Sequence, residues 1–75
     1  MNTLCHQIHE ILRSELSDTT AGIIIEQNSR AIGKDSDTVT FEDTKNLIRR
    51  ILLSVFLFGG MEKAKRIKDK FDGIK

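Results

Sequence analysis

The side chains best suited to bind a metal or act as a nucleophile lie near one end of the chain, where Cys5, His6 and His9 fall within five residues. Cys5 and His9 are four positions apart and share one edge of a helix, a spacing that can hold a metal ion or pair a thiol with a base. His6 points away from that edge on an ideal helix, and a structural zinc site needs four ligands. Because the sequence has no other cysteine or histidine, we expect a packed cysteine and two surface histidines, without metal binding or catalysis.

Three aspartates, Asp35, Asp37 and Asp43, invite a comparison with calcium-binding loops. If Asp35 begins an EF-hand loop, Thr40 stands where glycine is required and Asn46 stands where the bidentate glutamate is required. The glycines of the chain form neither GxGxxG nor GxxxxGK[ST], the two common phosphate-binding patterns. The sequence therefore predicts no cofactor, no small-molecule substrate and no enzymatic activity.

The element that should organise the fold is a helix over about 41–58. Thr40 and Asp43 form a capping-box-like pair before it, in which the threonine hydroxyl can accept from the Asp43 backbone N–H. Glu42 and Asp43 place negative charge at the positive end of the helix dipole, and Gly59 and Gly60 offer a left-handed C-cap. At about 100° per residue, the expected core-facing stripe consists of Phe41, Thr44, Leu47, Ile48, Ile51, Leu52, Val55 and Phe58.

The back side of this central helix is apolar in its second half, where it carries Leu53, Phe56 and Leu57. The uncharged run over 51–61 is too short to span a bilayer, which needs about 20 residues, so the back side has to be covered in another way. A neighbouring helix, a second copy of the chain, or a membrane surface or different partner are the alternatives. Arg49 and Arg50 either ring such an interface or extend into solvent with their stems over apolar neighbours.

Three further helices are expected over about 3–16, 19–32 and 61–72. Thr3 can cap the first, and Gly33 can end the second. The β-branched run at 23–25 also suits a short strand, but no second convincing strand exists to pair with it. Asn28 lies on the apolar face of the second helix, where it either fixes the register between helices or reaches water. The last helix should bury a narrow stripe made of Met61, Ala64, Ile67, Phe71 and Ile74.

The last helix is also the most basic part of the chain. Residues 61–75 contain six basic and three acidic side chains, a local charge of +3 in a chain whose net charge is +1. Such a face can contact phosphates, although acids interrupt it and no aromatic side chain accompanies it. The alternative function is therefore nucleic-acid binding through Lys63, Lys65, Arg66 and Lys70.

One short segment resembles a known family. The stretch TVTFED over 38–43 is similar to the TVT-x-x-D segment that opens the last helix of histone-fold proteins. A histone fold needs a long central helix before this point, whereas Ser17 and Gly33 confine the preceding helix to about fourteen residues. The resemblance covers six residues, and we infer no histone function from it.

Length and composition complete the prediction. A chain of 75 residues makes one domain over 1–75, and one this short buries only about 60% of its unfolded surface. Its single cysteine excludes an internal disulfide, so oligomerisation is the favoured source of additional stability. The start of the chain lacks the pattern of a signal peptide, and we expect a cytoplasmic protein. The sequence thus predicts an all-α, four-helix domain packed around the central helix, and a non-catalytic interaction module that forms a homodimer through Arg49, Arg50, Leu53, Phe56 and Leu57.

Overall fold

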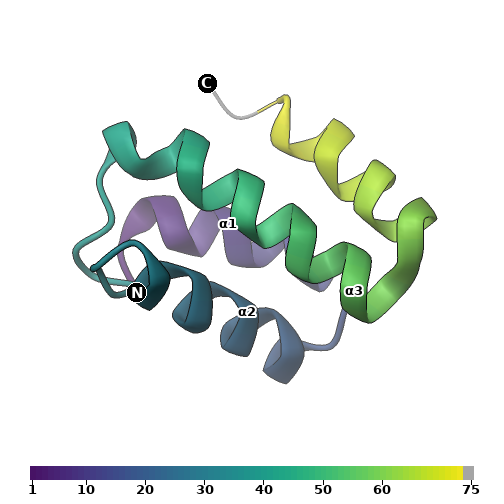
Figure 1. The fold of residues 1–75 in the computed structure, drawn as a ribbon, viewed down its shortest axis with the longest axis horizontal. Coiled ribbons are helices and arrows are strands. Elements are labelled where there is room, and N and C mark those ends of the chain that lie inside the picture. The colour runs from purple at the N-terminus through teal and green to yellow at the C-terminus, as the bar shows by residue number, and fades with distance from the viewer. Residues whose placement is uncertain (74–75) are drawn as a thin grey trace.

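The computed structural model describes residues 1–73, and this part of the chain is all-helical, as predicted. It contains α1 (Thr3–Arg13), α2 (Asp18–Ala31), the short 3₁₀ turn η1 (Phe41–Asp43) and α3 (Thr44–Phe71). The helices form a compact bundle with principal extents of 29 × 23 × 18 Å. In Figure 1, α2 and the beginning of α3 lie in front of α1, and the end of α3 folds back above its beginning.

The prediction of four helices is wrong, because the described residues form three. The segments expected as separate third and fourth helices are joined in α3, without an intervening loop. Gly60 alone leaves the helical conformation, with φ 86° and ψ 174°. We call residues 44–59 the first arm of α3 and residues 61–71 the second arm. The chain does turn at the Gly59–Gly60 pair, where the sequence predicted a helix end. Only Gly60 changes conformation to make this turn.

Side-chain caps set the start of the first two helices. Asn2, rather than the expected Thr3, caps α1, and its side-chain oxygen accepts from the Cys5 backbone N–H at 2.9 Å. The Asn2 amide also donates to the Val39 carbonyl at 2.6 Å, which ties the start of α1 to the loop before α3. Ser17 caps α2 by accepting from the Thr20 backbone N–H. Helix α1 ends at Arg13, three residues earlier than predicted, because the chain must turn before Ser17 can cap the next helix.

The C-terminal end of α2 follows the prediction closely. Gly33 adopts φ 78°, and the Lys34 backbone N–H returns to the Ser29 carbonyl at 2.9 Å, as in a Schellman motif. Residues 23–25 are helical, so the alternative of a short strand is wrong. Ile24 and Ile25 face the core, while Ile23 lies on the exposed side, as expected from the helical period.

At the start of α3, Thr40 and Asp43 interact as a pair. The Asp43 carboxylate accepts from the Thr40 backbone N–H at 2.9 Å and from the Thr40 hydroxyl at 3.0 Å. This is the reciprocal capping box that the sequence suggested, in which the Thr40 side chain meets the Asp43 backbone N–H and the Asp43 side chain meets the Thr40 backbone N–H. These hydrogen bonds lower the pKa of Asp43, the backbone N–H contributing most. They stabilise η1, so that the α-helical part begins at Thr44 rather than at residue 41.

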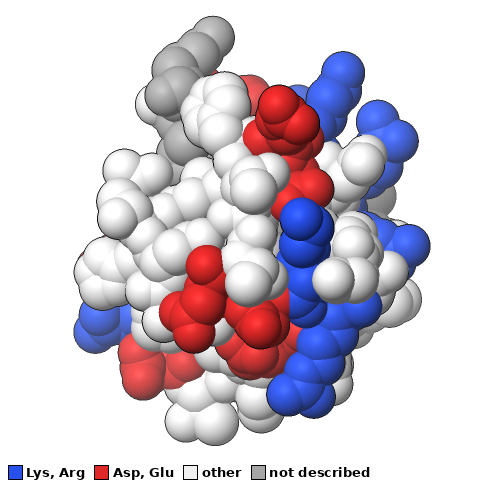
Figure 2. All heavy atoms as spheres, turned by 90° about the vertical axis from the view of Figure 1, so that its left-hand side faces the viewer, with Lys and Arg blue, Asp and Glu red and all other residues white. Residues whose placement is uncertain are grey.

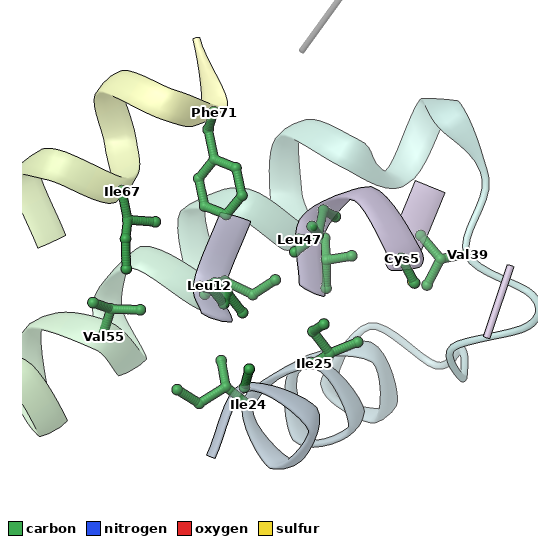
Figure 3. Close-up of a cluster of buried hydrophobic side chains, with 12 residues drawn as sticks. Cys5, Leu12, Ile24, Ile25, Val39, Leu47, Val55, Ile67 and Phe71 are labelled. Carbon is green, nitrogen blue, oxygen red and sulfur yellow. The ribbon is translucent and has the colours of Figure 1, made fainter. Parts of the chain in front are cut away.

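All three helices contribute to one hydrophobic core (Figure 3). The first arm of α3 supplies Leu47, Ile51 and Val55, and the second arm supplies Ile67 and Phe71. The most extensive helix contact joins α1 to α2, so the expectation that α3 alone is the hub is wrong. The contributions from outside α3 are Cys5, Ile8, Leu12, Ala21, Ile24, Ile25 and Val39.

Three apolar residues predicted for the core lie on the surface instead. Phe41 belongs to η1, before the first full turn of α3, and is 70% exposed. Phe58 and Met61 flank Gly60 at the end of the first arm and are 68% and 70% exposed. At this bend the first arm has passed beyond the core, so the stripe has no partner there. Ile74 lies outside the described residues.

Within residues 1–73, no helix is both long and apolar enough to cross a membrane.

Candidate interaction surface

A groove of about 790 Å³ lies against the outer side of the first arm of α3. Four of the five residues predicted for the interface line it, namely Arg49, Arg50, Leu53 and Phe56. The fifth, Leu57, does not line the groove but is 74% exposed. These residues line one groove because positions i, i+3, i+4 and i+7 share one helix face.

The apolar side chains of this face are not covered by the rest of the chain. Leu53 is 62% exposed and Phe56 is 46% exposed. Ile32, just after α2, and Ala64 from the second arm border the groove without covering these two residues. Within residues 1–73, therefore, no neighbouring helix covers the back side, which was one of the alternatives considered above.

A buried hydrogen bond sets the rotation of the first arm. Asn28 of α2 is buried, and its amide donates to the Ile24 carbonyl at 2.7 Å and to the Ser54 hydroxyl at 3.0 Å. Ser54 faces α2, and its neighbour Leu53, about 100° away around the helix axis, is turned toward solvent. Of the two interpretations of Asn28, the structure confirms the one in which it links helices. This polar contact and the burial of Leu47, Ile51 and Val55 together hold the apolar face outward.

The basic residues of the second arm are partly engaged within the chain. Arg66 donates to Glu15 Oε1 from Nε at 3.1 Å and from Nη2 at 2.9 Å. Lys70 Nζ lies 3.6 Å from Glu15 Oε2 and donates to the Ser14 hydroxyl. Two of the four side chains considered for nucleic-acid binding, Arg66 and Lys70, thus already have an acidic partner, while Lys63 and Lys65 have none among the described interactions. A phosphate would have to compete with the Glu15 carboxylate for the paired side chains.

The charge distribution elsewhere also argues against a nucleic-acid surface. At the end of the molecule that carries the loop between α2 and α3, acidic and basic side chains lie in adjacent clusters (Figure 2). Proteins that follow a phosphate backbone present a surface of one sign. No observation in the described residues therefore favours the nucleic-acid alternative over self-association.

Glu15 makes the acid stability of the fold testable. The hydrogen bond from Arg66, and then the charges of Arg66 and Lys70, lower the pKa of Glu15 below its ordinary value of 4.5. A carboxyl whose pKa is lowered in the folded state stabilises the fold above that ordinary value, and the stabilisation is lost as the pH falls through the folded-state pKa. We expect Glu15→Gln to flatten the fall in unfolding free energy between about pH 5 and pH 3, as measured by urea titration at each pH.

The matched control for that prediction is Glu10→Gln. Glu10 is exposed and pairs only with Arg13 of the same helix, at 2.9 Å, so its loss leaves the contact between α1 and the second arm intact. The Glu10→Gln protein should keep the acid dependence of the original chain. If the unfolding free energy of Glu15→Gln falls with pH as steeply as that of the original chain, the Glu15 carboxylate does not stabilise the fold through Arg66 and Lys70.

The cysteine and the two histidines lie in different surroundings. Cys5 is fully buried in the core, and burial raises the pKa of its thiol above the ordinary value of 9.0. His6 is exposed, and His9 Nε2 lies 3.5 Å from an Asp18 carboxylate oxygen. Among residues 1–73, no three histidine, cysteine, aspartate or glutamate side chains are arranged to hold a metal ion. A buried thiol with a raised pKa is a poor nucleophile.

The carboxylates of Asp35 and Asp43 accept hydrogen bonds from backbone N–H groups. The Asp35 carboxylate accepts from the backbone N–H groups of Asp37 at 2.8 Å and Thr38 at 3.0 Å. These bonds, with that from Asp37 the strongest, lower the pKa of Asp35. Asp43 caps η1, as described above. Asp35 and Asp43 therefore act in a turn and a cap, consistent with the interpretation that the three aspartates do not form a calcium loop.

Sequence reasoning missed three residues that the structure brings into view. Phe58 and Met61 add exposed apolar surface at the bend, and Glu15, just after α1, binds the second arm. The Gly59–Gly60 pair could have indicated that Phe58 and Met61 are exposed. Where the chain reverses direction, apolar side chains on the core-facing side of the helix no longer have core residues opposite them. No sequence pattern singles out Glu15, since its partners lie 51 and 55 residues further along the chain.

Comparisons with known proteins do not extend this picture. No protein-family model, no curated protein and no solved structure matches the chain.

Proposed function

We propose that this protein is a non-catalytic interaction module that associates with a second copy of itself through the outer face of the first arm of α3. The observation that carries the proposal is the exposure of Leu53, Phe56 and Leu57 on one face of a helix in so small a domain. Apolar side chains that are exposed together are typical of interaction surfaces. Arg49 and Arg50 lie at the polar end of the same face and form its rim.

The arrangement of charge and apolar surface favours an antiparallel pair of α3 helices. A two-fold axis near Leu53 places Arg50 of each copy opposite Phe56 of the other, and Arg49 opposite Leu57. Each guanidinium then lies over an apolar or aromatic side chain, which is a favourable contact for arginine. A parallel pair would instead bring four arginines together without an acidic partner on that face, and this repulsion disfavours it.

The size of the face predicts how strong the association is. The first arm is about 24 Å long and one helix diameter, about 10 Å, in width. Such a face lies at the small end of specific interfaces, which bury about 800 Å² per partner at standard size. We therefore expect a dimer that dissociates on dilution rather than an obligate one.

Light scattering over a dilution series tests the proposal. The chain has a mass of 8.5 kDa, and we expect a doubled mass at high concentration that returns to the monomer value on dilution. The double variant Leu53→Glu/Phe56→Glu should be a folded monomer at every concentration, because it removes the apolar surface whose burial drives association and brings the carboxylates at position 53 of the two copies together at the two-fold axis. Helical content measured by circular dichroism would show that the variant is folded.

The matched control is Ile23→Glu/Phe41→Glu. These two residues are exposed apolar side chains on α2 and η1, away from the groove. This control should associate as the original chain does. A monomeric mass for the original chain at high concentration, or a folded Leu53→Glu/Phe56→Glu variant that still dimerises, would overturn the proposed interface.

A further inference from the structure

The second arm of α3 is attached to the rest of the molecule in two ways. Ile67 and Phe71 enter the core, where Ile67 points toward Val55 (Figure 3). Arg66 and Lys70 bind Glu15 at the end of α1. All of these contacts are made by side chains of the second arm itself, and a second copy carries the same side chains.

A single residue, Gly60, joins the two arms of α3 outside the helical conformation. Gly60 has φ 86° and ψ 174°, a region that is essentially restricted to glycine, while the rest of α3 is helical. A change of conformation at Gly60 alone would make α3 one continuous helix. No heavy atom lies within 4 Å of the position that a Gly60 Cβ would occupy, so backbone conformation and not packing excludes other residues there.

We propose that two copies exchange their second arms by straightening α3 at Gly60. In the exchanged dimer, Ile67, Phe71, Arg66 and Lys70 of each copy occupy the site formed by the other. All the contacts of the closed chain are kept, which is the condition that makes such an exchange low in cost. The occupant of the site is thus a named segment, residues 61–71 of a second copy.

Apolar side chains that are exposed around the bend would be buried in the exchanged dimer, which would stabilise it. Leu57, Phe58 and Met61 flank Gly60 and are each about two-thirds or more exposed in the closed chain. Two straightened helices must pass each other close to their Gly60 residues, and this brings the apolar side chains of both copies together. Burial of that surface favours the dimer, in addition to the contacts it shares with the closed form.

This inference goes beyond the proposed face-to-face dimer and does not rest on it. The exchange uses residues 61–71 and Glu15. Ala64 of the second arm borders the groove on the first arm, but Glu15, Gly60 and Arg66 do not. The two modes of association can therefore be lost separately.

The first experiment replaces the hinge residue. In Gly60→Ala, the side chain penalises the closed conformation by roughly tenfold per chain and favours a continuous helix. We expect the dimerisation constant to rise about a hundredfold, with a particle whose long helix measures about 42 Å, against a longest extent of 29 Å in the closed chain. Small-angle X-ray scattering measures this change. Gly22→Ala is the control, because Gly22 is helical in both forms and has open space around it.

The second experiment exchanges charges between chains. In the single variants Glu15→Arg and Arg66→Glu, the closed chain brings like charges together at the Glu15 site. When the two variants are mixed, an exchanged heterodimer brings the two substituted positions together at one site, where opposite charges then meet, and restores the native pair of Glu15 and Arg66 at the other site. We therefore expect heterodimers in at least tenfold excess over either homodimer, measured by native mass spectrometry, with a gain in helical content if the single variants are unfolded.

Two results would overturn the exchange. One is a Gly60→Ala protein, made in the Leu53→Glu/Phe56→Glu background so that the face-to-face interface is absent, that stays monomeric with the dimensions of the original chain. The other is a mixture of Glu15→Arg and Arg66→Glu that behaves as the average of its components, which is decisive even if Gly60→Ala does not fold. Neither result bears on the Leu53→Glu/Phe56→Glu test, so failure of the exchange and failure of the face-to-face dimer are distinguishable.

Discussion

Replacing Leu47 by alanine is expected to lower the free energy of unfolding by about 2–5 kcal/mol. Leu47 is fully buried in the first arm of α3, where it contributes to the core shared with α1 and α2. Truncation removes its buried methyl groups and leaves a cavity that the surrounding helices fill only in part. A domain of 75 residues has a total stability of roughly 4–11 kcal/mol, so this one change removes a large share of it.

Leu57→Ala provides the matched control for that prediction, since it is the same chemical change on the same helix. Leu57 is 74% exposed, and its truncation should change the unfolding free energy by less than about 0.5 kcal/mol. Both variants are to be compared by urea unfolding at low concentration, where association does not contribute. Equal losses for the two leucines would mean that the first arm is not oriented as the structure has it.

Replacing Phe71 by alanine is expected to cost about 3 kcal/mol. Phe71 is the last residue of α3, is only 3% exposed, and anchors the second arm in the core (Figure 3). The value lies at the low end for buried aromatic residues, because a helix end can relax more than a helix interior. Without this anchor, the Glu15 contacts and Ile67 are left to hold the arm. Hydrogen exchange should therefore show that protection is lost first in residues 61–71.

Phe58→Ala is the corresponding control at an exposed phenylalanine of the same helix. Phe58 is 68% exposed, so its removal should leave both stability and the protection of the second arm nearly unchanged. If Phe58→Ala destabilises the monomer as much as Phe71→Ala, the bend at Gly60 does not leave Phe58 in solvent.

The all-helical class and the apolar outer face were predictable because both depend on local periodicity. Hydrophobic residues at helical spacing identify α1, α2 and the first arm of α3 without knowledge of their neighbours. Leu53, Phe56 and Leu57 stand opposite Leu47, Ile51 and Val55 on any helix, so an apolar back face follows from spacing alone. Ser17 and Gly33 set their helix ends for equally local reasons, the first by accepting a backbone hydrogen bond and the second by adopting a positive φ.

Other features required knowledge of which segments meet in space. Phe58 carries the same apolar character as Val55, three residues earlier, yet only Val55 is buried, because the core ends before the bend. The sequence indicated a helix end at Gly60. It did not indicate that the two expected helices would follow each other directly as the two arms of α3. Glycine permits many conformations, and the packing of Ile67 and Phe71 selects the one observed.

By itself, then, the sequence determined the helical class, the position of most helix ends and the existence of an apolar face with two arginines at its rim, since each of these is decided within a few residues along the chain. Only the tertiary structure decided that this face remains uncovered, that Asn28 binds Ser54 and that Glu15 holds the second arm. Those outcomes depend on contacts between residues far apart in the chain, whose geometry arises only when the three helices pack against one another.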